Sequence, residues 1–153
     1  MSQVVQTNSK LFIPALGRLY TPLADVADVL LRVLVGGLFI PHGYAKLFVD
    51  TDKFIAFFGK LGFSSPVFMT YFIGSLEFFG AIAIILGLLT RPLAFMLFVA
   101  MAVAAAMVHL PKGWGVSSGG AEYVVALAGI ALILAMRGGG RWSLDRGLFG
   151  REI

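Results

Sequence analysis

Long apolar stretches alternate with short polar ones along this chain. Each apolar stretch is of the length that a helix needs to cross the hydrocarbon core of a bilayer, which is about 20 residues. Turn-rich or charged segments separate the stretches from one another. The pattern predicts four transmembrane helices, at residues 23–48, 66–89, 92–110 and 120–136.

The remaining segments are too short or too polar to span. Residues 1–22 combine a polar start with an apolar piece that is broken by prolines, which indicates a tail followed by an interfacial segment. Residues 49–65 mix charges with aromatic rings, which is typical of an amphipathic segment at the interface. We therefore divide the chain into an N-terminal tail and interfacial segment (1–22), a four-transmembrane-helix domain (23–136) and a basic C-terminal tail (137–153).

Composition agrees with this pattern. The 153 residues are 59% hydrophobic and only 13% charged, far from the average soluble domain, so we expect an all-α integral membrane four-helix bundle. The chain has no cysteine, which excludes disulfides, thiol relays and iron–sulfur clusters held by this chain. Redox chemistry would have to come from a cofactor or a partner.

The net charge of +4 does not indicate nucleic-acid binding, because the basic residues are split between loops and tails. In the predicted topology, seven basic residues lie on the side of the termini and four on the other side. The seven are Lys10, Arg18, Arg91, Arg137, Arg141, Arg146 and Arg151, and the four are Lys46, Lys53, Lys60 and Lys112. This asymmetry predicts a multi-pass protein of the inner (plasma) membrane with both termini in the cytoplasm.

The first predicted helix carries a polar stripe. Residues three or four positions apart share one helical face, and the stripe consists of Arg32, Gly36, Phe39, His42 or Gly43, and Lys46. Ionisable groups inside hydrocarbon are costly, so they normally face the bundle interior or water and find a partner. The stripe is therefore the first candidate for a functional site.

Glu77 falls near the middle of the second predicted helix, on a face of small residues that should pack inward. Its depth differs from that of Arg32 by roughly 8 Å at the helical rise, which a long arginine side chain could largely bridge. We therefore predict a buried charge pair between Arg32 and Glu77.

Two further ionisable residues flank the loop between the third and fourth predicted helices. His109 closes the third helix and Glu122 opens the fourth. In the predicted topology both lie at the level of His42 and Lys46. We therefore predict a ligand-binding site formed by His42, Lys46, His109 and Glu122.

Other readings of these residues remain open. The ionisable groups could be structural ion pairs and helix-end residues that only fix packing. His42 and His109 could be axial haem ligands, and together with Glu122 they could hold a divalent metal. Because the chain has only two histidines, one of them at a helix end, we expect neither haem nor a metal site.

The combined motifs resemble the DoxX family. They are Arg32, Gly36, Phe39, His42, Gly43 and Lys46 in the first helix, Glu77 in the second, LGLLTRPLA at residues 86–94, His109, Glu122, and GGGRWSLD at residues 138–145. The resemblance implies a small four-helix membrane protein of the kind found in bacteria and archaea. Some such proteins are associated with thiosulfate:quinone oxidoreductase and others with oxidative-stress or quinone-resistance systems.

We expect a membrane subunit that engages a quinone, or a similar small redox molecule, and docks a partner. His42, Lys46 and His109 supply donors for the quinone carbonyls, and Glu77 or Glu122 could relay protons. The partner would be a soluble oxidoreductase or another membrane subunit, and the chain could also form a homo-oligomer in the lipid bilayer. The alternative is a non-catalytic transport, assembly or adaptor protein with the same polar core. The sequence assigns no catalytic residue.

Overall fold

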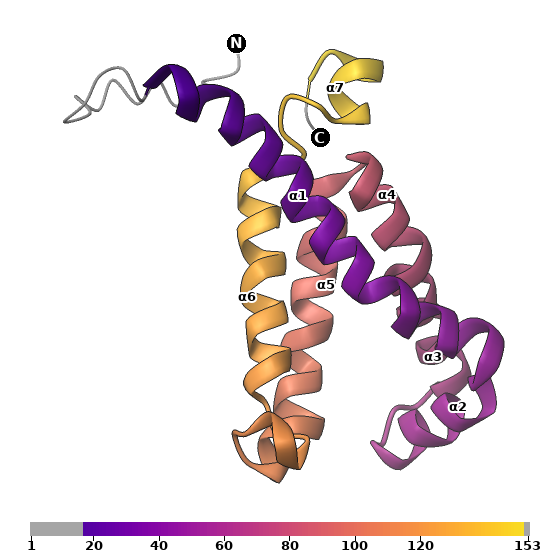
Figure 1. Cartoon of the computed structure of the whole chain (residues 1–153). Helices are drawn as coiled ribbons and strands as arrows, with labels where there is room; N and C mark the ends of the chain where they lie inside the picture. Colours follow the sequence, from indigo (N-terminus) through magenta and orange to yellow (C-terminus); the bar gives the residue numbers. More distant parts are fainter. Residues whose placement is uncertain (1–16, 152–153) are drawn as a thin grey trace.

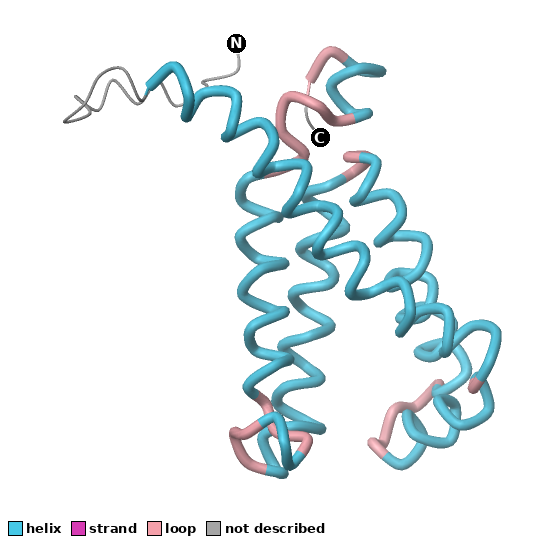
Figure 2. Tube along the Cα trace, in the orientation of Figure 1, coloured by secondary structure: helices cyan, strands magenta, loops and turns pink. Residues whose placement is uncertain are grey.

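The computed structural model describes residues 17–151, and every regular element in that range is a helix or a helical turn. Short loops connect them (Figure 2). In chain order they are α1 (Gly17–Tyr44), η2 (Ala45–Val49), α2 (Thr51–Lys60), α3 (Pro66–Ser75), η3 (Leu76–Gly80), α4 (Ala81–Leu86), α5 (Thr90–Ala104), η4 (Ala105–His109), η5 (Leu110–Lys112), η6 (Val116–Ser118), α6 (Glu122–Arg137) and α7 (Leu144–Phe149). The predicted all-α class is confirmed for the described residues. Most of the predicted N-terminal tail lies outside them.

The long helices pack as two pairs. α1 lies along η3 and α4, and α5 lies along α6. In Figure 1, α5 and α6 run side by side, whereas α1 crosses the molecule obliquely. The two pairs meet near the end that carries α7 and the start of α1. They separate toward the opposite end, where α2 and α3 lie away from α5 (Figure 1).

Two glycines let α1 approach its neighbours closely. A Cβ atom on Gly36 would lie 2.7 Å from the carbonyl oxygen of Ala81, and one on Gly43 would lie 2.7 Å from the carbonyl carbon of Glu77. Both distances are too short for a real contact, so only glycine fits at these crossings. Helices in lipid associate through such close van der Waals packing. The predicted stripe on the first helix is therefore the face that packs on η3 and α4.

Charged side chains join the two pairs at the end that carries α7. Arg137 donates from Nε to Oδ1 of Asp28 at 2.9 Å. Arg141 donates to Asp25 at 3.4 Å. Both contacts link α1 to the end of α6 and the segment that follows it, so this end of the bundle is held shut.

The segment after α6 folds back onto the bundle. Asp145 is only 1% exposed, and its Oδ1 accepts a hydrogen bond from the backbone N–H of Leu89 at 3.0 Å. The N–H of Asp145 donates in turn to the carbonyl of Gly87 at 3.0 Å. Leu89 has a left-handed backbone conformation, with φ of 49°, at the turn between α4 and α5. The described part of the predicted tail thus supports this turn.

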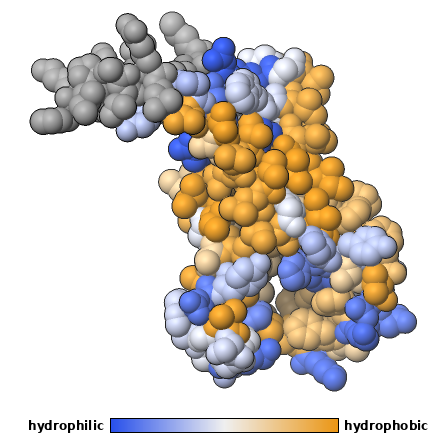
Figure 3. All heavy atoms as spheres, viewed as in Figure 1, coloured by the Kyte–Doolittle hydropathy of each residue, from blue (hydrophilic) through white to orange (hydrophobic). Residues whose placement is uncertain are grey.

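On the face shown in Figure 3, apolar side chains cover the middle of the molecule and polar ones gather toward its ends. Soluble proteins rarely expose so large an apolar surface. Two helical stretches are long and apolar enough to cross a membrane, Pro66–Leu86 with 21 residues and Thr90–Lys112 with 23. They coincide with the second and third predicted spans.

Helices also lie at the other two predicted positions. However, α6 has only 16 residues, and α1 carries the charges of Asp25, Asp28 and Arg32. That α1 and α6 cross the bilayer, and that both termini are cytoplasmic, therefore stay predictions. The beginning of α1 and the C-terminal helix α7 do lie at the same end of the bundle (Figure 1).

Candidate functional site

Three π-helical turns interrupt the long helices toward the end where the two helix pairs separate, which we call the open end of the bundle. They are η2, which continues α1, η3, which separates α3 from α4, and η4, which continues α5. A π-helical turn inserts an extra residue into a helix and is often found at functional sites. Each of these turns carries one ionisable side chain, namely Lys46, Glu77 or His109. The backbone is thus irregular where the polar groups lie.

Lys46 and Glu77 form a buried ion pair. Nζ of Lys46 lies 2.5 Å from Oε2 of Glu77. Lys46 is 9% exposed and Glu77 only 3%. Nζ also lies 4.8 Å from the ring centroid of Phe54 in α2, within range of a cation–π interaction. A single unpaired charge buried here would be costly, so each charged group is stabilised by the other.

A cavity of about 540 Å³ lies between the two helix pairs and contains this ion pair in its wall. Its volume is typical of small-molecule sites. The polar lining consists of His42, Lys46, Glu77, His109 and Tyr123. The rest of the lining is apolar and rich in phenylalanine and methionine from α2, α3 and α5. Figure 3 shows the hollow between the two lobes at the lower end of the molecule.

The two histidines face this cavity differently. Nδ1 of His109 lies 2.8 Å from the carbonyl oxygen of Gly119. A carbonyl can only accept, so Nδ1 carries the proton, and Nε2 of neutral His109 is left as an acceptor. The His42 side chain is exposed, and none of the described residues is hydrogen-bonded to its ring. Both imidazoles therefore keep a nitrogen available to a ligand.

Three of the four residues predicted to bind a ligand line this cavity, namely His42, Lys46 and His109. Glu122 does not line it. Glu122 is exposed, and its Oε2 accepts a hydrogen bond from the backbone N–H of Val116 at 3.2 Å. Its position therefore does not support a role in this site, nor in a metal site with the two histidines. Among the described residues, no three histidine, aspartate or glutamate side chains form a group that could hold a metal ion.

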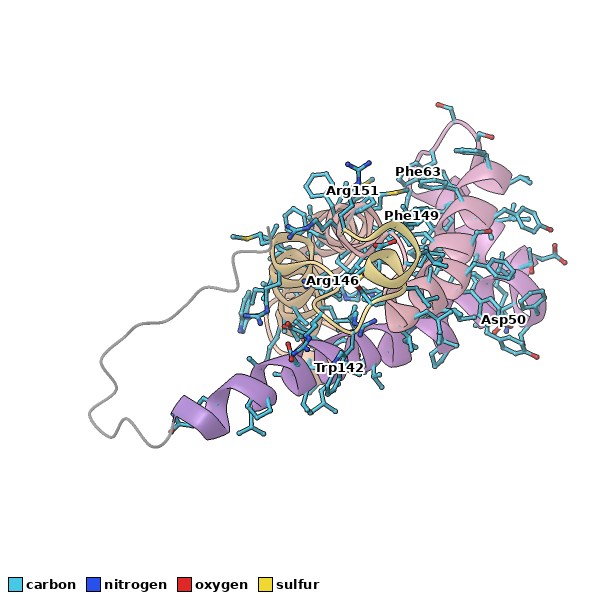
Figure 4. The ribbon with its side chains drawn as sticks, turned by 90° about the horizontal axis from the view of Figure 1, so that it is seen from above. Asp50, Phe63, Trp142, Arg146, Phe149 and Arg151 are labelled. Carbon is cyan, nitrogen blue, oxygen red and sulfur yellow. The ribbon has the colours of Figure 1, made fainter. Side chains whose placement is uncertain are left out.

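The predicted pairing of Arg32 with Glu77 is wrong, although both side chains are buried as expected. Arg32 donates to two carbonyl oxygens, that of Ile85 at 3.0 Å and that of Trp142 at 2.6 Å. Figure 4 shows Trp142 beside α1 at the end that carries α7. Because α1 runs obliquely, depths counted along two helices from the helical rise do not predict which of their side chains meet. Lys46, the stripe residue at the far end of the stripe from Arg32, pairs with the carboxylate instead.

The sequence predicted Glu77 as the partner of Arg32 and as a possible proton relay, but did not include it among the ligand-binding residues. The structure puts its carboxylate in the cavity wall with Lys46. The small-residue face of its helix predicted that Glu77 points inward, and Glu77 is indeed buried. The contribution of the α2 phenylalanines to the cavity was also missed, because the amphipathic segment at residues 49–65 was predicted only to lie at the membrane interface. Phe54 and Phe58 instead line the cavity.

These features define the class as a membrane protein, helical throughout its described residues, with a largely apolar cavity that carries a few ionisable side chains. Residues 27–110 match the family model described as DoxX, and the chain belongs to the DoxX family. A protein of Bacillus subtilis (strain 168) named "Putative oxidoreductase CatD" is 31% identical over 125 residues, covering 82% of this chain and 89% of that protein. "Inner membrane protein YqjF" of Escherichia coli (strain K12) is 32% identical over 126 residues, covering 81% of this chain and 93% of its own length.

A third relative, "Uncharacterized membrane protein Rv3486" of Mycobacterium tuberculosis (strain ATCC 25618 / H37Rv), is 29% identical over 146 residues. That match covers 88% of this chain and 89% of the relative. No solved structure matches the chain. The names of two relatives describe membrane proteins. The name of the Escherichia coli relative describes that protein as one of the inner membrane.

Proposed function

We propose that this protein binds a quinone, or a similar small redox molecule, in the cavity between the two helix pairs. The observation that carries the proposal is the distribution of chemistry around the cavity. Its ionisable groups come from α1 and the three π-helical turns, while the remaining walls are almost wholly apolar and aromatic. A quinone has the matching character, with polar oxygens on a flat apolar ring.

The two histidines suit a molecule that is both an acceptor and a donor of hydrogen bonds. A quinol hydroxyl can donate to Nε2 of neutral His109, and a quinone carbonyl can accept from the same nitrogen when the ring is protonated. Oxidation of one quinol releases two protons and two electrons. His42 and His109 supply two proton acceptors, and Lys46 can donate to a ligand oxygen while it remains paired with Glu77.

The electrons must pass to another protein if the bound molecule turns over in this site. We therefore include a partner oxidoreductase, soluble or membrane-bound, that exchanges electrons with the bound quinone. The absence of cysteine assigns any sulfur chemistry to that partner. The Bacillus subtilis relative carries the word oxidoreductase in its name, which agrees with a redox role.

Titration of the purified protein with a fluorescent or spin-labelled quinone analogue tests the proposal. His42→Ala and His109→Ala should each weaken binding about fivefold to tenfold, since a lost hydrogen bond costs about 1–1.5 kcal/mol. Glu122→Gln is the matched control, because Glu122 lies outside the cavity lining and its replacement can still accept from Val116. It should bind as the wild type does.

Equal affinity in the wild type and both histidine variants would exclude this binding site. If the wild type binds no quinone at all, a transport, assembly or adaptor role becomes the better account of the cavity. Loss of binding in Glu122→Gln alone would restore the site expected from the sequence, with the carboxylate as a ligand contact.

A further inference from the structure

One wall of the cavity is also part of the lipid-facing surface. Phe72 of α3 and Phe95 and Val99 of α5 line the cavity, yet they are 40%, 53% and 42% exposed. They belong to the two stretches that are long and apolar enough to cross a membrane. Side chains exposed on the sides of such helices face hydrocarbon. The cavity is therefore open sideways, between α3 and α5.

The arrangement of the helices explains this opening. The turn at residues 87–90 and the contacts of α4 and η3 with α5 hold the two stretches together near the end that carries α7. Beyond η3, α3 packs against α2 instead and diverges from α5 (Figure 1). The buried ion pair of Lys46 and Glu77 lies on the inner wall behind this opening.

We propose that the ligand is a lipid-soluble molecule with a long apolar chain, which enters from the bilayer between α3 and α5. Its head would lie between Lys46 and His42 on the side of α1 and His109 on the side of α5, and its chain would extend out between Phe72 and Phe95. This inference rests on the proposed function and names the class of its ligand. An apolar chain loses nothing by continuing from these side chains into lipid, because both surroundings are hydrocarbon.

The side chains at the opening favour a flexible chain over a neighbouring helix. Helices in lipid pack through small residues that let backbones approach. The opening has two small residues of α5, Ala100 and Ala104, but is lined mainly by large aromatic and flexible side chains, including Phe72, Phe95, Met96 and Met107. Methionine side chains adapt their shape readily to an irregular apolar occupant.

Photo-crosslinking in lipid nanodiscs tests the route of the chain. The probe is a dimethoxy-methyl-benzoquinone with a decyl chain that carries a diazirine close to the ring. We expect labels on α3 and α5, including Phe72 and Val99, and we expect an excess of the same quinone without a chain to compete for the site. Mass spectrometry of the digested protein locates the labels.

Val99→Trp should narrow the opening and lower the label on α3 and α5 about fivefold or more, since the added indole fills the space of the chain. Val125→Trp is the matched control. Val125 is a 39% exposed valine on α6 outside the cavity lining, so that variant should label as the wild type does.

The outcomes separate this inference from the proposed function. Labels that the chainless quinone displaces, but that lie on the loop at residues 110–121, would show a head site reached from the water side and overturn the inference alone. Labels that the chainless quinone does not displace, and that His42→Ala leaves unchanged, would overturn both. Absence of label on α3 and α5 because a second copy or another protein covers them would also overturn the inference.

Discussion

Breaking the ion pair between Lys46 and Glu77 should destabilise the protein strongly. The two charged atoms lie 2.5 Å apart, and the residues are 9% and 3% exposed. Lys46→Met leaves the carboxylate buried without a cation, and Glu77→Gln leaves the ammonium group without an anion. The combined variant removes both charges at once.

The expected size follows from this burial. Removing one partner of a buried pair costs about 3–5 kcal/mol, because the remaining charge is stranded, whereas replacing both charges is often close to neutral. The two single variants should therefore each lose several kcal/mol of unfolding free energy. The double variant should lose less than their sum by about 2 kcal/mol or more.

Unfolding in detergent micelles, followed by heat or by added denaturing detergent, measures the three variants against the wild type. A second cycle with Arg32→Met and Glu77→Gln is the control. Arg32 donates to the carbonyls of Ile85 and Trp142 and shares no partner with Glu77. In this second cycle, the losses of unfolding free energy of the two single variants should add up to that of the double variant within about 0.5 kcal/mol. Additive losses in the Lys46 cycle, or strong coupling in the Arg32 cycle, would refute the assignment of the pair.

Three further changes test other parts of the structure. Gly43→Ala should cost about 1–3 kcal/mol of unfolding free energy in the same assay, because its Cβ would press on the backbone at Glu77. Its control is Gly37→Ala, which should be neutral or stabilising because no atom lies within 4 Å of the new Cβ. Asp145→Ala should cost about 1–3 kcal/mol, because the N–H of Leu89 loses its acceptor, and a wild-type melting curve would contradict that bond. A reporter fused after residue 153 should be active only as a cytoplasmic fusion, and periplasmic activity would reverse the predicted topology.

The buried faces of α1 and of the α3–η3–α4 stretch could be predicted from the sequence. Residues three or four apart in α1 and η2, from Arg32 through Gly36, Phe39 and Gly43 to Lys46, are all buried. Helical spacing alone specifies such a face, whatever the neighbouring helix may be. The choice of partner across the interface could not be predicted in this way. It depends on the tilt of α1 against η3, which no local pattern encodes.

The inward face of α6 could not be predicted from the sequence, as Glu122 shows. Glu122, Ala126 and Gly129 are spaced to share one helical face of small or polar residues, which the sequence favours as an inward face, but all three residues are exposed. The buried face of α6 contains Val124, Leu127, Ala128, Ala131 and Leu134 instead. Small residues occur on both sides of this helix, so their periodicity did not specify which side packs against α5.

The π-helical turns could not be predicted either. A π turn adds one residue to a helix and rotates every later side chain by about 100° relative to a regular helix. No residue type marks η2, η3 or η4, whose sequences contain good helix formers such as leucine, alanine and lysine.

The two ends of the bundle differ in how firmly they are held, and this difference bears on the site. At one end Arg137, Arg141 and Asp145 tie α1, the α4–α5 turn and the C-terminal segment together. At the other end the helix pairs diverge, the helices depart from regular geometry, and a cavity takes the place of packed side chains. Packing alone would favour closing that cavity, since every unfilled volume costs dispersion energy. A bound molecule that fills the cavity and contacts its polar side chains would offset that cost. The contacts at the opposite end hold the two helix pairs together there, so the open end can keep its cavity.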